Sequence, residues 1–208
     1  MKTRREGAGG PASGKAARGD LIAAVHRSED FPRSQLPVLA FVGRSNVGKS
    51  TLLNRLLGLK VARTSRVPGK TRGIYFYETD EGHQIADLPG SGFARVSKQE
   101  RESWAELAEE LFAGGRVRLA VTLVDPYVPR AEVDIRMRQY LLERGVPTLA
   151  VATKWDRLSA RERERAQREL MKAHGQVFPV SAKTGEGVET LRREIHRRMQ
   201  EQRDGSNG

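Results

Sequence analysis

The sequence predicts an α/β fold in three layers, in which a mostly parallel six-stranded sheet, with one antiparallel strand, carries helices on both faces. Apolar, β-branched segments alternate with amphipathic segments of helical period along most of the chain. A glycine-rich loop joins the first strongly apolar segment to the amphipathic segment after it, and the loop has the spacing of a phosphate-binding site. These observations predict a single domain organised around a phosphate ligand.

The composition sets the size and class of the protein. The chain has 208 residues, 38% hydrophobic and 30% charged, which suffices for one globular domain with a full core and short tails. It has no cysteine, no run of about 18 apolar residues and no signal peptide, so we expect a cytoplasmic protein without a membrane span. The formal charge of +11 favours polyanionic partners such as RNA, DNA or anionic lipid.

The two ends of the chain are expected to be tails. Residues 1–20 place basic side chains among Gly, Ala, Pro and Ser, a composition that predicts a disordered basic tail. This tail is either an electrostatic tether for RNA or a solvated leader. The globular domain is expected over residues 21–199, starting with a short strand at 21–25. Residues 200–208 are expected to form a polar tail that frays.

The glycine-rich loop lies between a buried strand at 38–42 and an amphipathic helix that starts at Ser50. Its two glycines allow successive backbone N–H groups and the positive end of the helix to face one anion. Lys49 is placed to reach the terminal phosphates, and the Ser50 hydroxyl to bind Mg²⁺. The alternative is a glycine-rich turn with an adventitious Lys-Ser, but the flanking strand and helix favour nucleotide binding. The candidate nucleotide-binding residues here are Gly43, Arg44, Ser45, Asn46, Val47, Gly48, Lys49, Ser50 and Thr51.

A second phosphate-binding element is predicted after a hairpin. The helix is expected to end near Gly58, a basic loop follows at 60–72, and residues 73–79 and 83–87 predict two antiparallel strands joined by a turn at 80–82. At the C-terminal end of the second strand, the Asp87 carboxylate can hold Mg²⁺ through water, and the Gly90 N–H can face a γ-phosphate. This D-x-x-G pattern is weak alone and becomes specific after a phosphate loop. We expect residues 91–99 to be mobile.

Helices and strands then alternate to the end of the chain. We expect helices at 100–112, at 159–174 and from 188 onward, and a further helix that ends at Gly145. Strands are expected at 118–124, 146–152 and 176–180. The inner faces of the second, third and last helices are expected to carry Trp104, Leu107, Ala108, Leu111 and Phe112; Val133, Met137, Tyr140 and Leu141; and Val188, Leu191, Ile195 and Met199. The last helix also has an outer row, which is either a polyanion-binding face or ordinary solvated surface: Arg192, Arg193, Arg197 and Arg198.

The strand at 146–152 leads into Thr153-Lys154-Trp155-Asp156, which predicts a guanine site. A carboxylate at this position can accept hydrogen bonds from guanine N1–H and its exocyclic amine, which adenine does not offer, while the lysine stem covers the base. The alternative is a strand-to-helix turn in which Asp156 is a cap. The order of the three elements along the chain favours the guanine site. Backbone N–H groups of a later turn are expected to meet guanine O6, and this turn is formed by Ser181, Ala182 and Lys183.

With these elements in place, the chain resembles the translation-factor-class P-loop GTPases, and within them the EngB (YihA) family of small bacterial GTPases. The similarity covers about residues 36–199. Its most specific parts are the segment at 41–50, Pro68-Gly69-Lys70-Thr71, and Asp87-Leu88-Pro89-Gly90. The resemblance implies that the Thr71 hydroxyl binds Mg²⁺ and that its backbone senses the γ-phosphate. It thereby adds the following to the nucleotide-binding residues: Gly69, Lys70, Thr71, Arg72, Gly73, Leu88 and Pro89.

The resemblance also implies a function. The family hydrolyses GTP to GDP and assists large ribosomal subunit assembly, and it is linked to cell division and septation. The catalytic residues would be Lys49, Thr71 and Gly90, and the Mg²⁺ ligands Ser50, Thr71 and Asp87. A ribosomal RNA or protein partner, no DNA specificity and a monomeric state are expected. The alternatives are a non-catalytic, GTP-gated interaction module in septation, and a P-loop ATPase or kinase, which guanine preference would exclude.

Two positions depart from the family pattern, and one suggests a cation. Ser91 replaces the usual aromatic residue and is not the glutamine that orients water in Ras-type enzymes. The strand at 118–124 ends in Asp125-Pro126-Tyr127 instead of Asp-x-Arg, which leaves a partner contact there open. Asn46 occupies the position that helps bind a monovalent cation in potassium-activated relatives. We therefore expect slow intrinsic hydrolysis, stimulated by K⁺ or by the ribosomal partner.

Overall fold

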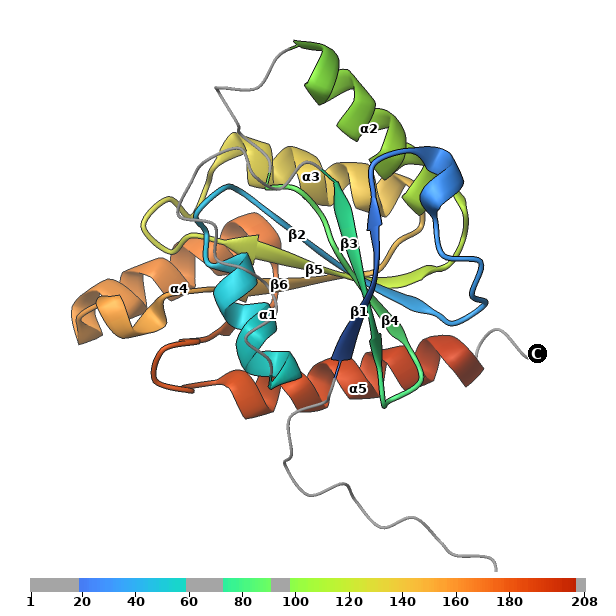
Figure 1. Cartoon of the computed structure of the whole chain (residues 1–208). Coiled ribbons are helices and arrows are strands. Elements are labelled where there is room, and N and C mark those ends of the chain that lie inside the picture. The colour runs from blue at the N-terminus through green and yellow to red at the C-terminus, as the bar shows by residue number, and fades with distance from the viewer. Residues whose placement is uncertain (1–18, 59–72, 91–97, 205–208) are drawn as a thin grey trace, which may run out of the picture.

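The structure is a computed structural model that describes residues 19–58, 73–90 and 98–204. A central sheet of seven strands runs in the order β1-β3-β4-β2-β5-β6-β7, with helices on both faces (Figure 1). The strands are β1 Gly19–Val25, β2 Val38–Gly43, β3 Ile74–Thr79, β4 Gln84–Asp87, β5 Val117–Val124, β6 Thr148–Ala152 and β7 Val177–Pro179. The helices are α1 Lys49–Leu57, α2 Lys98–Ala113, α3 Glu132–Glu143, α4 Ala160–His174 and α5 Val188–Asp204, with short 3₁₀ turns η1 Ser28–Asp30 and η2 Trp155–Arg157.

The strand directions confirm the predicted fold class. β3 pairs antiparallel with both β1 and β4, whereas the pairs β2–β4, β2–β5, β5–β6 and β6–β7 are all parallel. β3 is therefore the single antiparallel strand, as the hairpin pattern indicated. The count of six strands was wrong, because β1 adds a seventh at the edge beside β3. β1 also begins at Gly19, so that Gly19 and Asp20 lie in the sheet and not in the tail.

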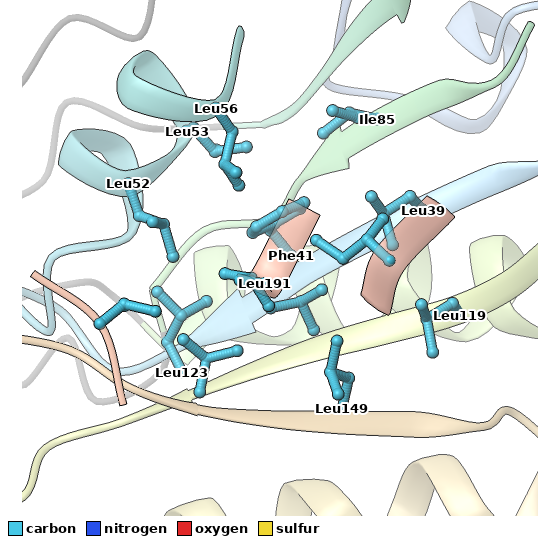
Figure 2. Packing of buried hydrophobic residues seen from close by; sticks show 14 of the residues in the cluster. Leu39, Phe41, Leu52, Leu53, Leu56, Ile85, Leu119, Leu123, Leu149 and Leu191 are labelled. Atoms are coloured by element: carbon cyan, nitrogen blue, oxygen red, sulfur yellow. The ribbon is translucent and has the colours of Figure 1, made fainter. Parts of the chain in front are cut away.

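Alternation along the central strands divides the core between the two faces of the sheet. In β2, Leu39 and Phe41 face one cluster, while Ala40 and Val42 face the other. Figure 2 shows the first cluster, where leucines of α1 and Leu191 of α5 pack over β2, β4, β5 and β6. The second cluster joins α2 and α3 to the opposite face, and a third packs α4 against β5, β6 and β7. Burial on both faces explains why β2 is a continuous apolar run.

Several helix boundaries differ from the prediction. α2 begins at Lys98, inside the segment expected to be mobile; the remainder of that segment, and the basic loop expected at 60–72, lie outside the described residues. α5 continues to Asp204, whereas we expected fraying from residue 200, and an ion pair between Arg197 and Glu201 ties the start of this last part to the preceding turn. None of the described helices combines the length and apolarity that a membrane span requires.

The inner faces of the helices are confirmed in part. The four expected residues of α5 are all buried: Val188, Leu191, Ile195 and Met199. In α2 the buried residues are Leu107, Leu111 and Phe112, whereas Trp104 and Ala108 are half-buried. In α3 only Leu141 of the predicted stripe is fully buried; Val133, Met137 and Tyr140 are half-buried, and Asp134 is buried instead. A buried carboxylate on this helix was not expected, and its partner lies in the phosphate loop.

Candidate nucleotide-binding site

The predicted phosphate loop connects the end of β2 to the start of α1. The loop turns through a left-handed conformation at Asn46, with φ of 63°, and at Gly48, with φ of 108°. Gly48 is the N-cap of α1, and this glycine offers no side-chain cap to the helix terminus. The first intrahelical bond is Leu52 N–H to Gly48 O at 3.0 Å, so the N–H groups of the first turn remain available. An open helix N-terminus behind a left-handed turn is the geometry that binds an anion.

The loop and the D-x-x-G segment meet through a buried ion pair. The Lys49 ammonium donates to Oδ1 of Asp87, which is the last residue of β4. Lys49 and Asp87 are 8% and 4% exposed, so both charges have left water. Burial raises the pKa of Asp87, and the charge of Lys49 and its hydrogen bond oppose that shift. The ammonium is thus held at the mouth of the loop, where a terminal phosphate would compete with Asp87 for it.

Gly90 lies directly against the phosphate loop. A Cβ atom at this position would come within 2.9 Å of the Ser45 backbone nitrogen and 3.0 Å of Ser45 Cα. Only glycine therefore allows the D-x-x-G segment to approach the loop this closely. The Ser45 hydroxyl is buried and has no hydrogen-bond partner among the described residues. This contact agrees with the prediction that the phosphate loop and the D-x-x-G segment face the same phosphate group.

The predicted guanine site is attached to the phosphate loop. Thr153 Oγ1 donates a hydrogen bond to the Val47 carbonyl of the loop, and Thr153 is buried. The next residue, Lys154, has a left-handed backbone with φ of 55°. Its Cε lies 4.0 Å from the position that a Cβ of Gly48 would occupy, and its ammonium pairs with Asp125 at 3.5 Å. The lysine stem therefore runs beside the loop, where it can cover a base plane.

Asp156 is oriented by a buried serine. The Ser181 hydroxyl donates to Asp156 Oδ1 at 2.6 Å, and this hydrogen bond lowers the pKa of Asp156 below its ordinary value. Ser181 is fully buried, and its own N–H donates to the Glu186 carbonyl at 2.9 Å. Glu186 is held in turn by two hydrogen bonds from Arg163, at 2.8 and 3.1 Å. Asp156 is thus kept ionised with one oxygen fixed, as an acceptor of two guanine donors requires.

The remaining predicted residues are placed with different outcomes. Ala182 is half-buried and Lys183 exposed, both directly after Ser181, while Thr51 is exposed on the first turn of α1. Gly73 lies against β1, since a Cβ there would meet the Val25 carbonyl at 2.3 Å, so its described contacts are with the sheet edge. Gly69, Lys70, Thr71 and Arg72 lie outside the described residues.

A Mg²⁺ site can be assessed only from Ser50 and Asp87. Ser50 is half-buried in the first turn of α1, and Asp87 is a buried carboxylate paired with the neighbouring Lys49. A hydroxyl and a carboxylate supply hard oxygen ligands, and Mg²⁺ in nucleotide sites takes few protein ligands besides phosphate and water. These two residues therefore fit the ion, and Thr71, the third predicted ligand, lies outside the described residues.

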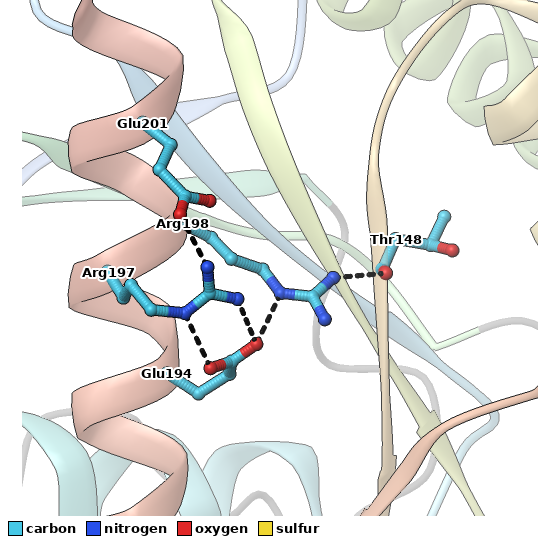
Figure 3. Close-up of polar contacts among 5 residues, drawn as sticks. All are labelled: Thr148, Glu194, Arg197, Arg198 and Glu201. Atoms are coloured by element: carbon cyan, nitrogen blue, oxygen red, sulfur yellow. Dashed lines mark hydrogen bonds and ion pairs between the residues drawn. The ribbon is translucent and has the colours of Figure 1, made fainter.

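The arginine row on α5 is largely engaged within the protein, as Figure 3 shows for Arg197 and Arg198. Arg197 pairs with Glu194 and Glu201, and Arg198 bonds both Glu194 at 2.7 Å and the Thr148 carbonyl at 3.2 Å. Arg192 reaches the Leu56 carbonyl at the end of α1, at 3.0 Å. Arg192 and Arg198 thus hold α5 to its neighbours, and Arg197 is paired within α5 itself, which weakens the prediction of a polyanion-binding face.

Two acidic residues near the site were missed by sequence reasoning. Asp134 accepts a hydrogen bond from Arg44 Nε at 3.1 Å, across 90 residues of sequence. Asp125 pairs with Lys154 and also accepts the Tyr127 N–H at 3.0 Å. Asp134 lies in the first turn of a helix, where an acidic residue ordinarily serves the helix dipole, so its pattern gave no separate signal. Asp125, at the end of a buried strand, was noted only as a departure from a motif.

The phosphate loop, the D-x-x-G contact and the serine-held carboxylate together define a P-loop GTP-binding domain. Residues 38–154 match the family model described as "50S ribosome-binding GTPase". Proteins named "Probable GTP-binding protein EngB" from Petrotoga mobilis and Acidobacterium capsulatum are 38% and 42% identical to this chain. These alignments cover 87% and 82% of the chain, and 95% and 85% of the two relatives. The chain therefore belongs to the EngB family of GTP-binding proteins.

Solved structures agree with this assignment. A crystal structure of a probable GTP-binding protein EngB matches with a TM-score of 0.67 and 30% identity, covering 79% of this chain and 99% of that one. The GTPase Era, crystallised with MgGDPNP and nucleotides of 16S ribosomal RNA, matches with a TM-score of 0.64 and 27% identity. This second match covers 77% of the chain and 56% of Era, so it concerns one part of that protein.

Proposed function

We propose that this protein is a Mg²⁺-dependent GTPase switch that assists assembly of the large ribosomal subunit in the cytoplasm. The observation that carries the proposal is the Thr153–Val47 hydrogen bond, because it joins the phosphate loop to the segment that bears the base-selecting Asp156. One rigid unit then presents both ends of a guanine nucleotide with their partners. The "50S ribosome-binding GTPase" family match supports the choice of partner.

The chemistry would be in-line attack of water on the γ-phosphate. Lys49 would leave Asp87 for the terminal phosphates and offset the charge that develops there. Ser50, Asp87 and Thr71 would hold Mg²⁺, which supplies further charge neutralisation when bound. Asn46, exposed in its left-handed turn, would offer its side-chain oxygen to K⁺. With no strong protein base among these groups, we expect slow intrinsic turnover that K⁺ or the ribosomal partner accelerates.

The switch would operate through Gly90 and Thr71. Both would contact the γ-phosphate, so hydrolysis removes the group that holds their segments in place. The GTP state would bind the precursor of the large subunit through basic side chains that remain exposed, among them Arg157, Arg161 and Arg193. Contacts to RNA phosphates weaken steeply with salt. Subunit binding that is insensitive to salt between low and physiological concentrations would contradict an RNA contact.

The first test measures GTP hydrolysis in Na⁺ and in K⁺ buffers, with and without large ribosomal subunits. Stimulation by subunits that is lost in Lys49→Ala supports an assembly GTPase. Undetectable hydrolysis in every condition, with GTP-dependent partner binding retained, would instead support a non-catalytic module acting in septation. The cation proposal is decided separately with Asn46→Gly, which removes the side-chain oxygen and tolerates the positive φ of 63°. Stimulation by K⁺ that disappears in this variant supports the proposal, and no stimulation of the wild type by K⁺ would refute it.

A second test addresses nucleotide selection. Asp156→Asn replaces one carboxylate oxygen, an acceptor, by an amide group that donates. The variant should therefore bind GDP more weakly and xanthosine diphosphate more tightly than the wild type does. Glu189→Gln, an exposed carboxylate on α5, is the matched control and should change neither affinity. Unchanged preference in Asp156→Asn would refute the guanine site and reopen the ATPase or kinase alternative.

A further inference from the structure

The Arg44–Asp134 ion pair links the phosphate loop to α3. Arg44 is the first residue after β2, and its Nε donates to Asp134 Oδ2 at 3.1 Å. The side chains are 25% and 4% exposed, so the carboxylate lies inside the protein and depends on this guanidinium for charge balance. Burial raises the pKa of Asp134, Arg44 opposes the shift, and the nearby Asp125 adds to it. The pair is therefore a buried contact with consequences for both of its ends.

Arg44 also has no competing acceptor in the described part of the chain. Its Nη2 is buried and without a hydrogen-bond partner there, so Asp134 is the acceptor that fixes the guanidinium. The backbone carbonyl of Arg44 accepts the Val47 N–H at 3.2 Å, a bond that closes the first turn of the loop. A guanidinium anchored on α3 therefore fixes the residue from which the phosphate loop turns.

The loop needs such anchors because its own geometry is costly. A non-glycine residue, Asn46, adopts positive φ, and no side-chain cap stabilises the start of α1. The described contacts hold the loop from three sides: Arg44 to α3, the Val47 carbonyl to Thr153, and Ser45 against Gly90. Of these three, only the Arg44 contact is made by a loop side chain to a helix outside the predicted nucleotide motifs.

We propose that Asp134 is a positioning residue that holds the phosphate loop in its nucleotide-binding shape through Arg44, so that guanine nucleotide is retained. The proposal rests on the proposed function, since it assumes that this loop binds the nucleotide phosphates. Neither side chain needs to touch the nucleotide. Without the anchor the loop can leave the conformation that binds the nucleotide. Binding must then order the loop again, and the free-energy cost of this ordering lowers the affinity.

The experiment measures the affinity and dissociation rate of a fluorescent GDP analogue in the full chain, together with the thermal midpoint. Asp134→Ala and Arg44→Gln should each weaken binding about tenfold or more, mainly through faster dissociation. Asp134→Asn should lose less, because its amide oxygen still accepts the Arg44 Nε–H. The double variant Arg44→Gln/Asp134→Asn should be no weaker than Arg44→Gln alone, as residues that act through one contact are not additive.

The matched control is an ion pair on the same helix. Glu132 and Arg136 pair on the exposed face of α3, with side chains 77% and 73% exposed, so Glu132→Ala and Arg136→Ala should leave the affinity unchanged. Three results would overturn the proposal. These are wild-type affinity in Asp134→Ala despite a lowered thermal midpoint, loss of affinity in Arg44→Gln but not in Asp134→Ala, and additive losses in the double variant.

The proposal and the proposed function fail in different ways. If Lys49→Ala binds the analogue as tightly as the wild type, the loop is not the nucleotide site, and the proposed function fails. If Lys49→Ala abolishes binding while both Asp134→Ala and Arg44→Gln retain it, the nucleotide site stands and only the positioning role fails.

Discussion

Lys49 and Asp87 form a buried ion pair between the first residue of α1 and the last residue of β4, 38 positions apart in the sequence. The parallel register places Asp87 opposite Phe41 of β2, so the sheet itself brings the carboxylate to the phosphate loop. Each charge is compensated only by close pairing, because burial has removed most of its hydration. The same two residues are the predicted phosphate and Mg²⁺ ligands, and ligand binding must therefore exchange one buried pairing for others.

Lys49→Met is expected to destabilise the free protein by about 3 kcal/mol at neutral pH, since it leaves the Asp87 carboxylate buried without a partner. Burial already raises the pKa of Asp87 above 3.8, so the native state takes up the proton more readily than the unfolded state. The destabilisation should shrink as the pH falls through the raised pKa of the native carboxyl, and the carboxyl is protonated in both states only once the pH is well below 3.8. Denaturant unfolding at several pH values measures it. The double variant Lys49→Met/Asp87→Asn should recover most of the stability but no nucleotide binding; a double variant as unstable as Lys49→Met would contradict the assignment.

Gly90→Ala is expected to lower the free energy of unfolding by about 1–3 kcal/mol and to reduce GTP hydrolysis, because the new Cβ would meet Ser45 backbone atoms at 2.9–3.0 Å. Because the clash would involve backbone atoms of Ser45, and not a movable side chain, little relaxation is available. Gly114→Ala, at the end of α2, is the control. A Cβ there would lie 3.3 Å from the Glu110 carbonyl oxygen, and the free energy of unfolding should change by no more than about 0.5 kcal/mol. Equal effects of the two substitutions would show that the Gly90 contact has no special role.

Ser181→Ala is expected to weaken GDP binding about tenfold, since it removes the hydrogen bond that orients and ionises Asp156. The pKa of Asp156 is lowered mainly by this bond, so the variant's pKa should rise toward 3.8. In the proposed guanine site GDP binding needs the ionised carboxylate, so the loss of binding on acidification should begin at a higher pH in the variant. Binding measured from about pH 6 down to about pH 3 tests this shift, because both carboxyls titrate at or below 3.8. Ser159→Ala, which removes the cap of α4, should alter stability without this change in pH dependence.

Glu194→Gln is expected to destabilise the protein by about 1 kcal/mol at neutral pH, the size of a partly solvated network. Hydrogen bonds from Arg197, and then Arg198, lower the pKa of Glu194 from 4.5 to about 2. A depressed carboxyl pKa stabilises the native state above the unfolded value, so the advantage of the wild type should be full above about pH 4.5 and vanish near about pH 2. Urea unfolding of both proteins across this range measures the difference. A gap that does not close on acidification would assign the effect to packing.

Most of the fold could be predicted from the spacing of apolar residues and from the residues that mark turns. The continuous apolar run of β2, the turn signal of the hairpin and the four buried positions of α5 each indicate the element that the structure contains. Ends were less predictable. Residues 200–204 carry no apolar anchor, yet the helix continues through them, with Glu201 paired to the preceding turn, and a sequence pattern of polar residues does not reveal such a contact.

The site was predictable where its chemistry lies within one short motif. Lys49 and Asp156 each come shortly after a strand and Asp87 ends one, and all three carry a side chain suited to phosphate, metal or base. The supports of these residues were not predictable, because they come from distant elements. Asp134 reaches Arg44 across 90 residues, and nothing in the first turn of an ordinary helix distinguishes a buried acid from an exposed one.

The position of β1 has a consequence for the order of biosynthesis. Within residues 19–58, 73–90 and 98–204, β1 is the first strand and pairs in the sheet with β3 alone, with Gly19 opposite Thr79 and Val25 opposite Ile74. A growing chain that has reached only α1 has synthesised β1 without the strand that completes its hydrogen bonds. During that interval the backbone of β1 has no β3 to pair with, and Val25, which is buried in the complete fold, has no β3 side chains to pack against. β1 is thus synthesised early but enters the sheet late, because its backbone hydrogen bonds form only after the β3–β4 hairpin has been made.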